Sequence, residues 1–276
     1  MDNQQLKEKA DKLRVDVLKM VTNANSGHPG GALGMADIIT TLHYDFINDR
    51  PSDPTWPQRD RFILSNGHTC PLLYAILADK GYFPRKELDS FRKLGALLQG
   101  HPSTAKGIPG VELSSGSLGH GLSFASGVAL SGRLDESDFK VYCSISDAEC
   151  QEGQTWEAAA VANHQNLGNL CAIVDYNDSQ IDGKVSNIMD VSPLADKWRS
   201  FGWNVLEIDG HNYDEIRNAL SSFVEESAPE GSPTVIVSRN VLGRGVSFME
   251  DDYHWHHGAL TEDQLETALR ELGPGE

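Results

Sequence analysis

Two stretches of similar design decide the fold of this chain: KVYCSISDAECQEG at residues 140–153 and LCAIVDYNDSQIDG at residues 170–183. Each begins with an apolar run of strand length and passes directly into polar, Asp-containing residues. Continuous apolar runs of this length are typical of strands that are buried on both faces of a parallel sheet. Residues 151–165 have a helical pattern, so the two stretches together predict a β-α-β unit.

The same alternation continues on both sides of this unit. Strands are expected at residues 62–65, 140–145, 170–176, 203–208 and 233–238. Helices are expected at residues 4–24, 33–47, 69–80, 86–94, 151–165, 192–201, 212–226 and 262–272. The Gly- and Pro-rich residues 25–31 are expected to form an irregular loop. Because no repeat or linker divides the sequence, we expect one doubly wound, mostly parallel α/β domain over residues 1–276.

The composition limits the partners of the chain. Its 276 residues include 40 acidic and 23 basic ones, for a formal net charge of −17. Nucleic acids and anionic membranes are bound through clustered Lys and Arg, so neither is expected as a partner. No apolar run approaches the roughly 20 residues that span a bilayer, and the first five residues do not resemble a signal peptide. The four cysteines have no metal-ligand spacing, and the two in strand-like apolar runs are expected as buried free thiols. Reduced thiols favour a cytoplasmic location.

Polar side chains follow the two central strands at the point where each strand ends. Asp147 comes directly after the first strand, and Asn177 directly after the second. If these strands are neighbours, both side chains lie at the edge of the sheet where open α/β sheets bind ligands. A carboxylate, an amide oxygen and a nearby backbone carbonyl suit Mg²⁺ or Ca²⁺, and a helix beginning near Gln151 would direct its N–H groups at a diphosphate. The structural alternative is that Asp147 caps this helix and Asn177 supports a turn.

Short motifs rich in Gly and His follow one another along the chain. They are SGHPG at 26–30, RDRF at 59–62, LSNGH at 64–68, GHP at 100–102, GSLGHG at 116–121, IDG at 181–183 and HWHHGAL at 254–260. Together with Asp147, the segment QEGQTWEAA at 151–159 and Asn177, they resemble the transketolase family. The motifs cover nearly the whole chain. The resemblance implies a thiamine-diphosphate-binding α/β fold.

The resemblance also implies a metal and a cofactor. Asp147, Asn177 and the backbone carbonyl of Ser179 correspond to the family's ligands for Mg²⁺, with Ca²⁺ or Mn²⁺ as substitutes. His68 and His257 correspond to histidines that contact the diphosphate of thiamine diphosphate, because imidazole N–H groups donate to phosphate oxygens. Further cofactor contacts are implied at Gly116, Ser117, Leu118, Ala148, Asp175, Asn177 and Ile181.

Catalytic roles follow from the same correspondence. His28, His101 and His257 match histidines that line the substrate channel and bind or transfer protons at sugar hydroxyls, work that suits imidazole. Glu152 and Glu157 match acidic residues of the family's subunit contact.

Other interpretations of the histidines are simpler. A His beside Gly in a loop, such as His28 or His68, is usually a turn residue when it is judged alone. The group at His254, His256 and His257 lacks the cysteine or carboxylate of a tetrahedral zinc site, so zinc is not expected. The histidines that match no motif are expected at the surface or in packing: His43, His164 and His211.

Two motifs depart from the family pattern. The usual Gly-Asp-Gly is Ser146-Asp147-Ala148 here, and Ala148 can still donate its N–H to a diphosphate unless its φ is positive. The usual Gly-Pro-Leu-Gly-Gln becomes GSLGH at residues 116–120, a mild change in a loop that acts mainly through its backbone.

The resemblance covers only one part of a transketolase. The pyrimidine-binding domain, with the activating glutamate and the arginines for sugar phosphate, and the C-terminal domain have no counterpart in this sequence. We therefore expect the N-terminal subunit of a split transketolase, active with a partner that carries those domains, in an α2β2 assembly. It would transfer a two-carbon ketol unit from a ketose (phosphate) donor to an aldose (phosphate) acceptor. The alternatives are a non-catalytic binding or regulatory protein, and a split transketolase of a specialised sugar, sulfosugar or secondary-metabolite pathway.

Overall fold

A five-stranded parallel sheet runs through the structure, a computed structural model that describes residues 1–225 and 231–273. Its strands, in spatial order, are β1 Arg61–Leu64, β2 Val141–Ser146, β3 Leu170–Tyr176, β7 Thr234–Arg239 and β6 Asn204–Asp209. The register of β2 and β3 sets Ser146 beside Asp175, so these two strands end at the same edge. The expected parallel α/β sheet is confirmed, and each strand lies within one residue of its predicted range.

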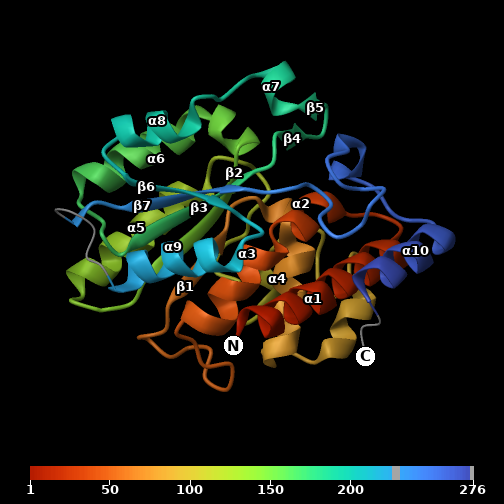
Figure 1. Ribbon diagram of the computed structural model, residues 1–276. Coiled ribbons are helices and arrows are strands. Elements are labelled where there is room, and N and C mark those ends of the chain that lie inside the picture. Colours follow the sequence, from red (N-terminus) through yellow and green to blue (C-terminus); the bar gives the residue numbers. More distant parts are fainter. Residues whose placement is uncertain (226–230, 274–276) are drawn as a thin grey trace.

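Helices cover both faces of this sheet (Figure 1). The helix layer on one face consists of α1 Asn3–Ala24, α3 Ala36–Thr41, α4 Cys70–Lys80 and α9 Tyr213–Glu225, and α10 Glu262–Leu272 packs against α1. The other face is covered by α5 Gly121–Leu134, α6 Gly153–His164 and α8 Leu194–Ser200. Successive strand residues alternate between the two hydrophobic clusters: Phe62 and Leu64 belong to the first and Ile63 to the second. The central strands β2, β3 and β7 are therefore buried along nearly their whole length, which explains their continuous apolar signal in the sequence.

Short elements fill the connections. They are the helices α2 Pro29–Gly34 and α7 Val185–Ile188, the π turn Leu42–Phe46, and the antiparallel pair β4 Ser179–Gln180 and β5 Gly183–Lys184. Single 3₁₀ turns occupy Gly67–Thr69, Arg85–Ser90, Thr104–Lys106, Ala148–Gln151 and Tyr253–His256. All four cysteines are buried free thiols, the two expected ones among them. In the described part of the chain, no helix has the length and apolar character needed to cross a membrane.

Several expected helices are corrected by the structure. The Gly- and Pro-rich loop is partly helical, because Pro29 stands at the first position of α2, where a missing N–H costs nothing. The single helix expected at 33–47 is divided among α2, α3 and the π turn. The helix expected at 86–94 is wrong: a 3₁₀ turn ends at Ser90, and Arg92 and Gly95 then take positive φ angles. The helix expected at 192–201 begins at Leu194, and residue 226, at the end of the helix expected at 212–226, lies outside the described residues.

Helix α5 forms in the structure although the sequence carries no clear helical signal for it. Its fourteen residues include three Gly and three Ser, which are poor helix formers. Leu122, Ala125 and Ala129 pack on the sheet and make the helix stable through tertiary contacts instead.

Candidate functional site

The carboxyl end of β2 presents a buried carboxylate. The Asp147 side chain is fully buried, and its two oxygens accept hydrogen bonds from the N–H groups of Ala148 and Asp178, both at 2.7 Å. The second of these bonds reaches across from β2 to the turn after β3. The expected meeting of the two strand ends is therefore observed.

The turn after β3 is organised around two further predicted residues. Asn177 donates to the Asp175 carboxylate at 2.8 Å and accepts a hydrogen bond from the Ser179 N–H at 2.9 Å. All three side chains are buried. The structure thus gathers Asp147, Asn177 and Ser179, the predicted metal ligands, at one edge of the sheet.

The electrostatics of this edge fit a divalent cation. Burial, together with the neighbouring Asp175 carboxylate, raises the pKa of Asp147 to about 8. Burial also raises the pKa of Asp175 to about 7. Neither carboxylate forms an ion pair with any residue that the structure describes, so a bound cation would relieve the cost of burying their charge. A carboxylate with amide and carbonyl oxygens is the donor set that Mg²⁺ or Ca²⁺ prefers.

The turn that follows Asp147 differs from the expectation. The sequence predicts a helix from near Gln151, but a 3₁₀ turn ends there and α6 begins only at Gly153, because Glu152 takes an extended backbone conformation between them. The N–H groups of α6 are therefore not placed directly behind Asp147. Ala148 does not have a positive φ, and its N–H is directed to the Asp147 carboxylate.

Histidines from four separate segments converge in the same region. The distances between ring centroids are 5.3 Å from His28 to His68, 5.9 Å to His101, 5.7 Å to His256 and 4.7 Å to His257. The rings of His68 and His256 are 5.0 Å apart. The structure thus brings together the four histidines that the resemblance selected, and adds His256 to them. We call these five residues the histidine cluster.

Helix α2 joins the histidine cluster to the carboxylate edge. A Cβ placed on Gly31 would lie 3.1 Å from the Thr69 side chain and 3.6 Å from Asp175 Oδ2. The neighbouring Gly27 carbonyl accepts a hydrogen bond from the Gly258 N–H at 2.9 Å, next to His257. These contacts place α2 and the loop before it beside the Asp175 carboxylate and beside the segments that carry His68 and His257.

Burial favours the neutral form of four members of the histidine cluster, His28, His68, His101 and His256. Burial, together with the mutual repulsion of the imidazoles, lowers the pKa of His28 to about 2 and that of His68 to about 3. The pKa values of His101 and His256 are also lowered, mainly by burial. A neutral imidazole has one donor and one acceptor nitrogen, so each of these side chains can donate one hydrogen bond and accept another.

Two buried polar atoms near the cluster have no partner among the described residues: His28 Nδ1 and Ser115 Oγ. Ser115 precedes Gly116, where a Cβ would lie 2.9 Å from the His101 ring and strain a backbone with φ of 146°. Buried polar atoms are normally hydrogen-bonded, so these two atoms are open to a polar ligand.

The remaining predicted residues border this region. Ser117 is exposed and Leu118 half-buried in the loop after Gly116, and Ile181 is 60% exposed in the β4–β5 hairpin, which packs on the Tyr253–His256 turn. Glu152 and Glu157 are exposed at and near the start of α6. The histidines expected in packing or at the surface lie there: His43 is buried, His164 is exposed, and His211 bonds to Asp37.

Sequence patterns gave no role to three residues that organise the site. Asn240 donates to Asp175 Oδ1 at 2.7 Å, and it follows β7 just as Asn177 follows β3, so the rule of strand ends could have found it. Glu149 is buried and accepts hydrogen bonds from the Ser65 hydroxyl and the Gly119 N–H. His256 has no signal beyond its place in the HWHHGAL motif.

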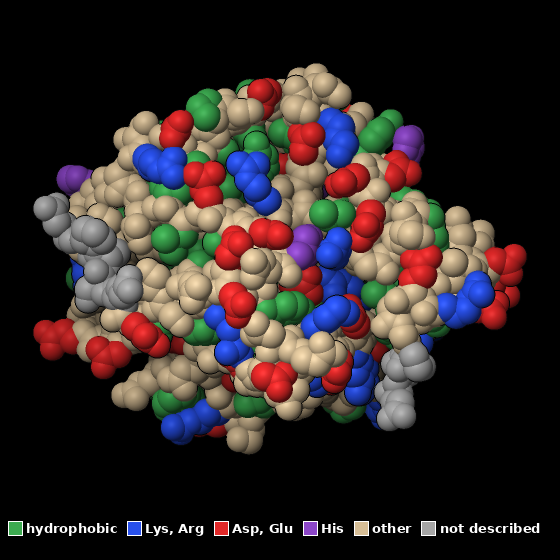
Figure 2. Space-filling model, viewed as in Figure 1, with side chains coloured by type: hydrophobic (Ala, Val, Ile, Leu, Met, Phe, Trp, Pro, Cys, Tyr) green, Lys and Arg blue, Asp and Glu red, His purple; other side chains and the backbone are tan. Residues whose placement is uncertain are grey.

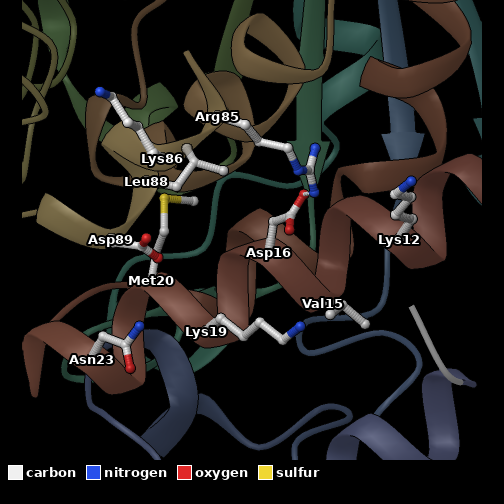
Figure 3. A pocket seen from close by; sticks show the side chains of 10 residues that line it. All are labelled: Lys12, Val15, Asp16, Lys19, Met20, Asn23, Arg85, Lys86, Leu88 and Asp89. Carbon is white, nitrogen blue, oxygen red and sulfur yellow. Dashed lines mark hydrogen bonds and ion pairs between the residues drawn. The ribbon is translucent and has the colours of Figure 1, made fainter. Parts of the chain in front are cut away.

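The cavity between α1 and the Arg85–Ser90 turn lies apart from the candidate site and contains none of its residues. This cavity has a volume of about 370 Å³ and is lined by Lys, Arg, Asp, Asn and apolar side chains (Figure 3). Figure 2 shows acidic and basic side chains interspersed over one face of the molecule.

The described residues contain no group of three or more His, Cys, Asp or Glu able to hold a metal ion, so a metal site at Asp147 would have to use amide and carbonyl oxygens as well.

Known proteins share this sequence and this arrangement. The family profile described as "Transketolase, thiamine diphosphate binding domain" matches residues 5–275. One relative, a subunit of the apulose-4-phosphate transketolase of Phocaeicola vulgatus, is 37% identical over 99% of this chain and 95% of that protein. Another, the 6-deoxy-6-sulfo-D-fructose transketolase subunit SqwG of Clostridium sp., is 40% identical over 97% of this chain and 96% of its own length.

Longer transketolases match over part of their length. Human transketolase is 35% identical over 98% of this chain but only 42% of its own. The crystal structure of transketolase from Campylobacter jejuni superposes with a TM-score of 0.93 at 34% identity, over 99% of this chain and 43% of that one. The profile, the relatives and the superposed fold agree, and the chain belongs to the transketolase family, within its thiamine-diphosphate-binding domain.

Proposed function

We propose that this chain is the thiamine-diphosphate-binding subunit of a two-chain transketolase that moves a two-carbon ketol unit from a ketose to an aldose. The observation that carries the proposal is the histidine cluster, which four distant segments build beside the buried carboxylates at the ends of β2 and β3. The carboxylate edge would bind a cation, and the cation would bind a diphosphate. The histidines would bind the hydroxyl groups of a sugar.

The partner chain is part of the proposal. The two relatives named as subunits match this chain over nearly all of their length, whereas human transketolase extends far beyond the match. We propose that the partner carries the pyrimidine-binding and C-terminal domains, and that residues 1–276 form the single diphosphate-binding domain. Two copies of each chain would form the α2β2 assembly, located in the cytoplasm.

The carboxylate edge would hold the metal and the diphosphate. Asp147, Asn177 and the Ser179 carbonyl would coordinate Mg²⁺, with Ca²⁺ or Mn²⁺ as substitutes, because hard cations prefer oxygen ligands. His68 and His257 would donate N–H groups to the diphosphate. The remaining contacts to the cofactor would come from Gly116, Ser117, Leu118, Ala148, Asp175 and Ile181.

The histidine cluster would handle the protons of the substrate. The bound cofactor supplies the nucleophilic carbon and the electron sink for the two-carbon unit. His28, His101 and His257 would hold the sugar hydroxyls and move protons at their oxygens. Neutral imidazoles at His28 and His101 suit the binding of sugar hydroxyls, because each can donate one hydrogen bond and accept another.

The names of the relatives suggest which substrates to test. They refer to apulose 4-phosphate and to 6-deoxy-6-sulfo-D-fructose, two unusual sugars. We propose a specialised sugar pathway for this chain as well. A panel of ketose donors that includes both compounds, assayed with several aldose phosphates, would identify the donor and the acceptor.

The decisive experiment compares the chain alone with the chain bound to its partner. Ketol transfer is expected only when both chains, thiamine diphosphate and Mg²⁺ are present. Activity from this chain alone would contradict the two-subunit proposal. Calorimetry that detects no cofactor binding in the complex would instead favour a non-catalytic binding protein.

A further inference from the structure

Arg92 has no role in the proposal above, yet it touches two of the segments that carry the candidate catalytic histidines. Its Nη1 donates to Ser26 Oγ at 2.9 Å, two residues before His28. Its Nη2 lies 3.5 Å from the carbonyl oxygen of Gly100, the residue before His101. The guanidinium therefore spans the space between the two segments.

The backbone around Arg92 is built to hold this side chain in place. Arg92 has a φ of 60°, a left-handed conformation that residues other than Gly adopt rarely. Its N–H donates to the Leu98 carbonyl at 2.9 Å, which closes the turn between Arg92 and Gly100. Gly100 packs directly on the guanidinium, since a Cβ there would lie 2.6 Å from Arg92 Cζ. A strained residue that persists in a folded chain requires surroundings that fix it, and such residues cluster at functional sites.

The charge of Arg92 also acts on the two histidines. It lowers the pKa of His101 after the larger effect of burial, and it adds to the lowering at His28. Arg92 forms no ion pair with any residue in the described ranges 1–225 and 231–273, and its Nε is buried without a partner. No carboxylate of these residues therefore neutralises the cation beside the imidazoles.

We propose that Arg92 is a positioning residue, whose guanidinium joins the segment before His28 to the segment before His101 and fixes the two imidazoles relative to each other. The inference rests on the proposed function for its catalytic consequence, while the joint itself is a property of this chain. Groups that act on one substrate must be held close to their productive geometry, and an error of about 1 Å can cost on the order of 100-fold in rate.

The test compares Arg92→Ala and Arg92→Lys with Arg85→Ala as the matched control. Arg85 bonds to Asp16 and Asp79 beside the cavity drawn in Figure 3, and in the described structure it bonds to no histidine. In the complete complex, Arg92→Ala is expected to lower kcat/KM about 10- to 100-fold, while half-saturation by thiamine diphosphate changes less than about threefold. Arg92→Lys restores the charge but not both contacts, so its kcat/KM should remain closer to that of Arg92→Ala. Arg85→Ala should lower stability and leave kcat/KM within about twofold of the wild type.

A second measurement uses the full chain without substrate or cofactor. Histidine Cε1–H resonances, assigned with His28→Gln and His101→Gln, are followed by NMR as the pH is changed. Arg92→Ala should shift the resonances of His28 and His101 and raise both pKa values, because a neighbouring cation is removed. The His164 resonance should not move.

Unchanged kcat/KM together with unchanged His28 and His101 resonances in Arg92→Ala would overturn the proposal, as would an equal loss of kcat/KM in Arg85→Ala. If the wild-type complex itself transfers no ketol unit, the proposed function fails. The NMR comparison then still decides whether Arg92 fixes the two imidazoles.

Discussion

The site is built from side chains whose protonation states are set by burial. The same desolvation that raises the pKa of Asp147 and Asp175 lowers the pKa of His28 and His68, because in each case the charged form is the one disfavoured. At neutral pH the carboxylate edge is therefore prepared for a cation. His28 and His68 remain uncharged, and each can donate one hydrogen bond and accept another.

Asp147 should make the stability of the metal-free chain fall as pH rises. Its folded pKa of about 8 lies above the unfolded value of 3.8, so between these pH values the folded state binds more protons than the unfolded state. The wild type should lose stability relative to Asp147→Asn by up to about 1 kcal/mol per pH unit across this range. Urea unfolding at pH 5, 6, 7 and 8, without metal or cofactor, measures the difference.

Mg²⁺ with thiamine diphosphate should reverse this fall of stability with pH in the wild-type complex, because metal binding displaces the proton from the carboxylate.

Asp147→Ala should retain no cofactor, whereas Asp190→Ala, which removes an exposed carboxylate, should retain it. Parallel pH curves for the wild type and Asp147→Asn would contradict the raised pKa of Asp147, and unchanged cofactor retention in Asp147→Ala would remove Asp147 from the metal site.

Among the elements, the junction of β1, β2 and α5 shapes the loop at residues 116–118, which carries three of the predicted cofactor contacts. Ser65, at the end of β1, accepts the Gly121 N–H at 2.9 Å and donates to Glu149. Glu149 in turn accepts the Gly119 N–H at 2.7 Å. These bonds tie the first turn of α5 and the loop before it to the ends of two strands.

Gly121 and Gly127, both in α5, offer a matched test of this junction. A Cβ at Gly121 would lie 2.2 Å from Ser65 Cβ, whereas one at Gly127 would meet nothing within 4 Å. Gly121→Ala should destabilise the chain by about 1–3 kcal/mol through overpacking and weaken cofactor binding in the complex. Gly127→Ala should stabilise the chain by about 0.5–1 kcal/mol, since Ala is the better helix former. Urea unfolding and a cofactor titration measure both effects, and equal stability of the two variants would refute the argument.

How far the elements could be predicted depended on where their stability originates. The strands and the long helices α1, α4 and α10 carry apolar periodicity or capping signals in their own residues, and their predicted ranges hold. Helix α5 and the divided helix at residues 29–46 depend on packing against distant segments, which periodicity does not report.

At the scale of the whole molecule, the face formed by α5 and α6 is the surface we assign to subunit contact. The two helices pack together, and they leave Phe124 39% and Val161 53% exposed near the exposed Glu157. Exposed large apolar side chains on adjoining helices are typical of an interface. Glu152, at the start of α6, would belong to the same contact.

Val161→Glu should weaken the assembly without unfolding the chain, because it places a charge in the proposed contact. Val224→Glu on α9 is the control, since Val224 is 38% exposed on the helix layer of the opposite face. Mass photometry of the complex should show smaller species for Val161→Glu only. An identical mass distribution for both variants would exclude this face from the contact.

The sequence by itself determined the parallel α/β sheet, the meeting of Asp147 and Asn177 at one edge, and the family. These features depend on patterns along adjacent residues, and the rule that parallel strands end at one edge converts such patterns into position. Only the tertiary structure decided that α5 forms, that His256 joins the histidine cluster, that Asn240 holds Asp175, and that Arg92 joins two histidine segments. Each of these depends on contacts between segments far apart in the chain, and the free energy that fixes them is gained only when those segments pack together.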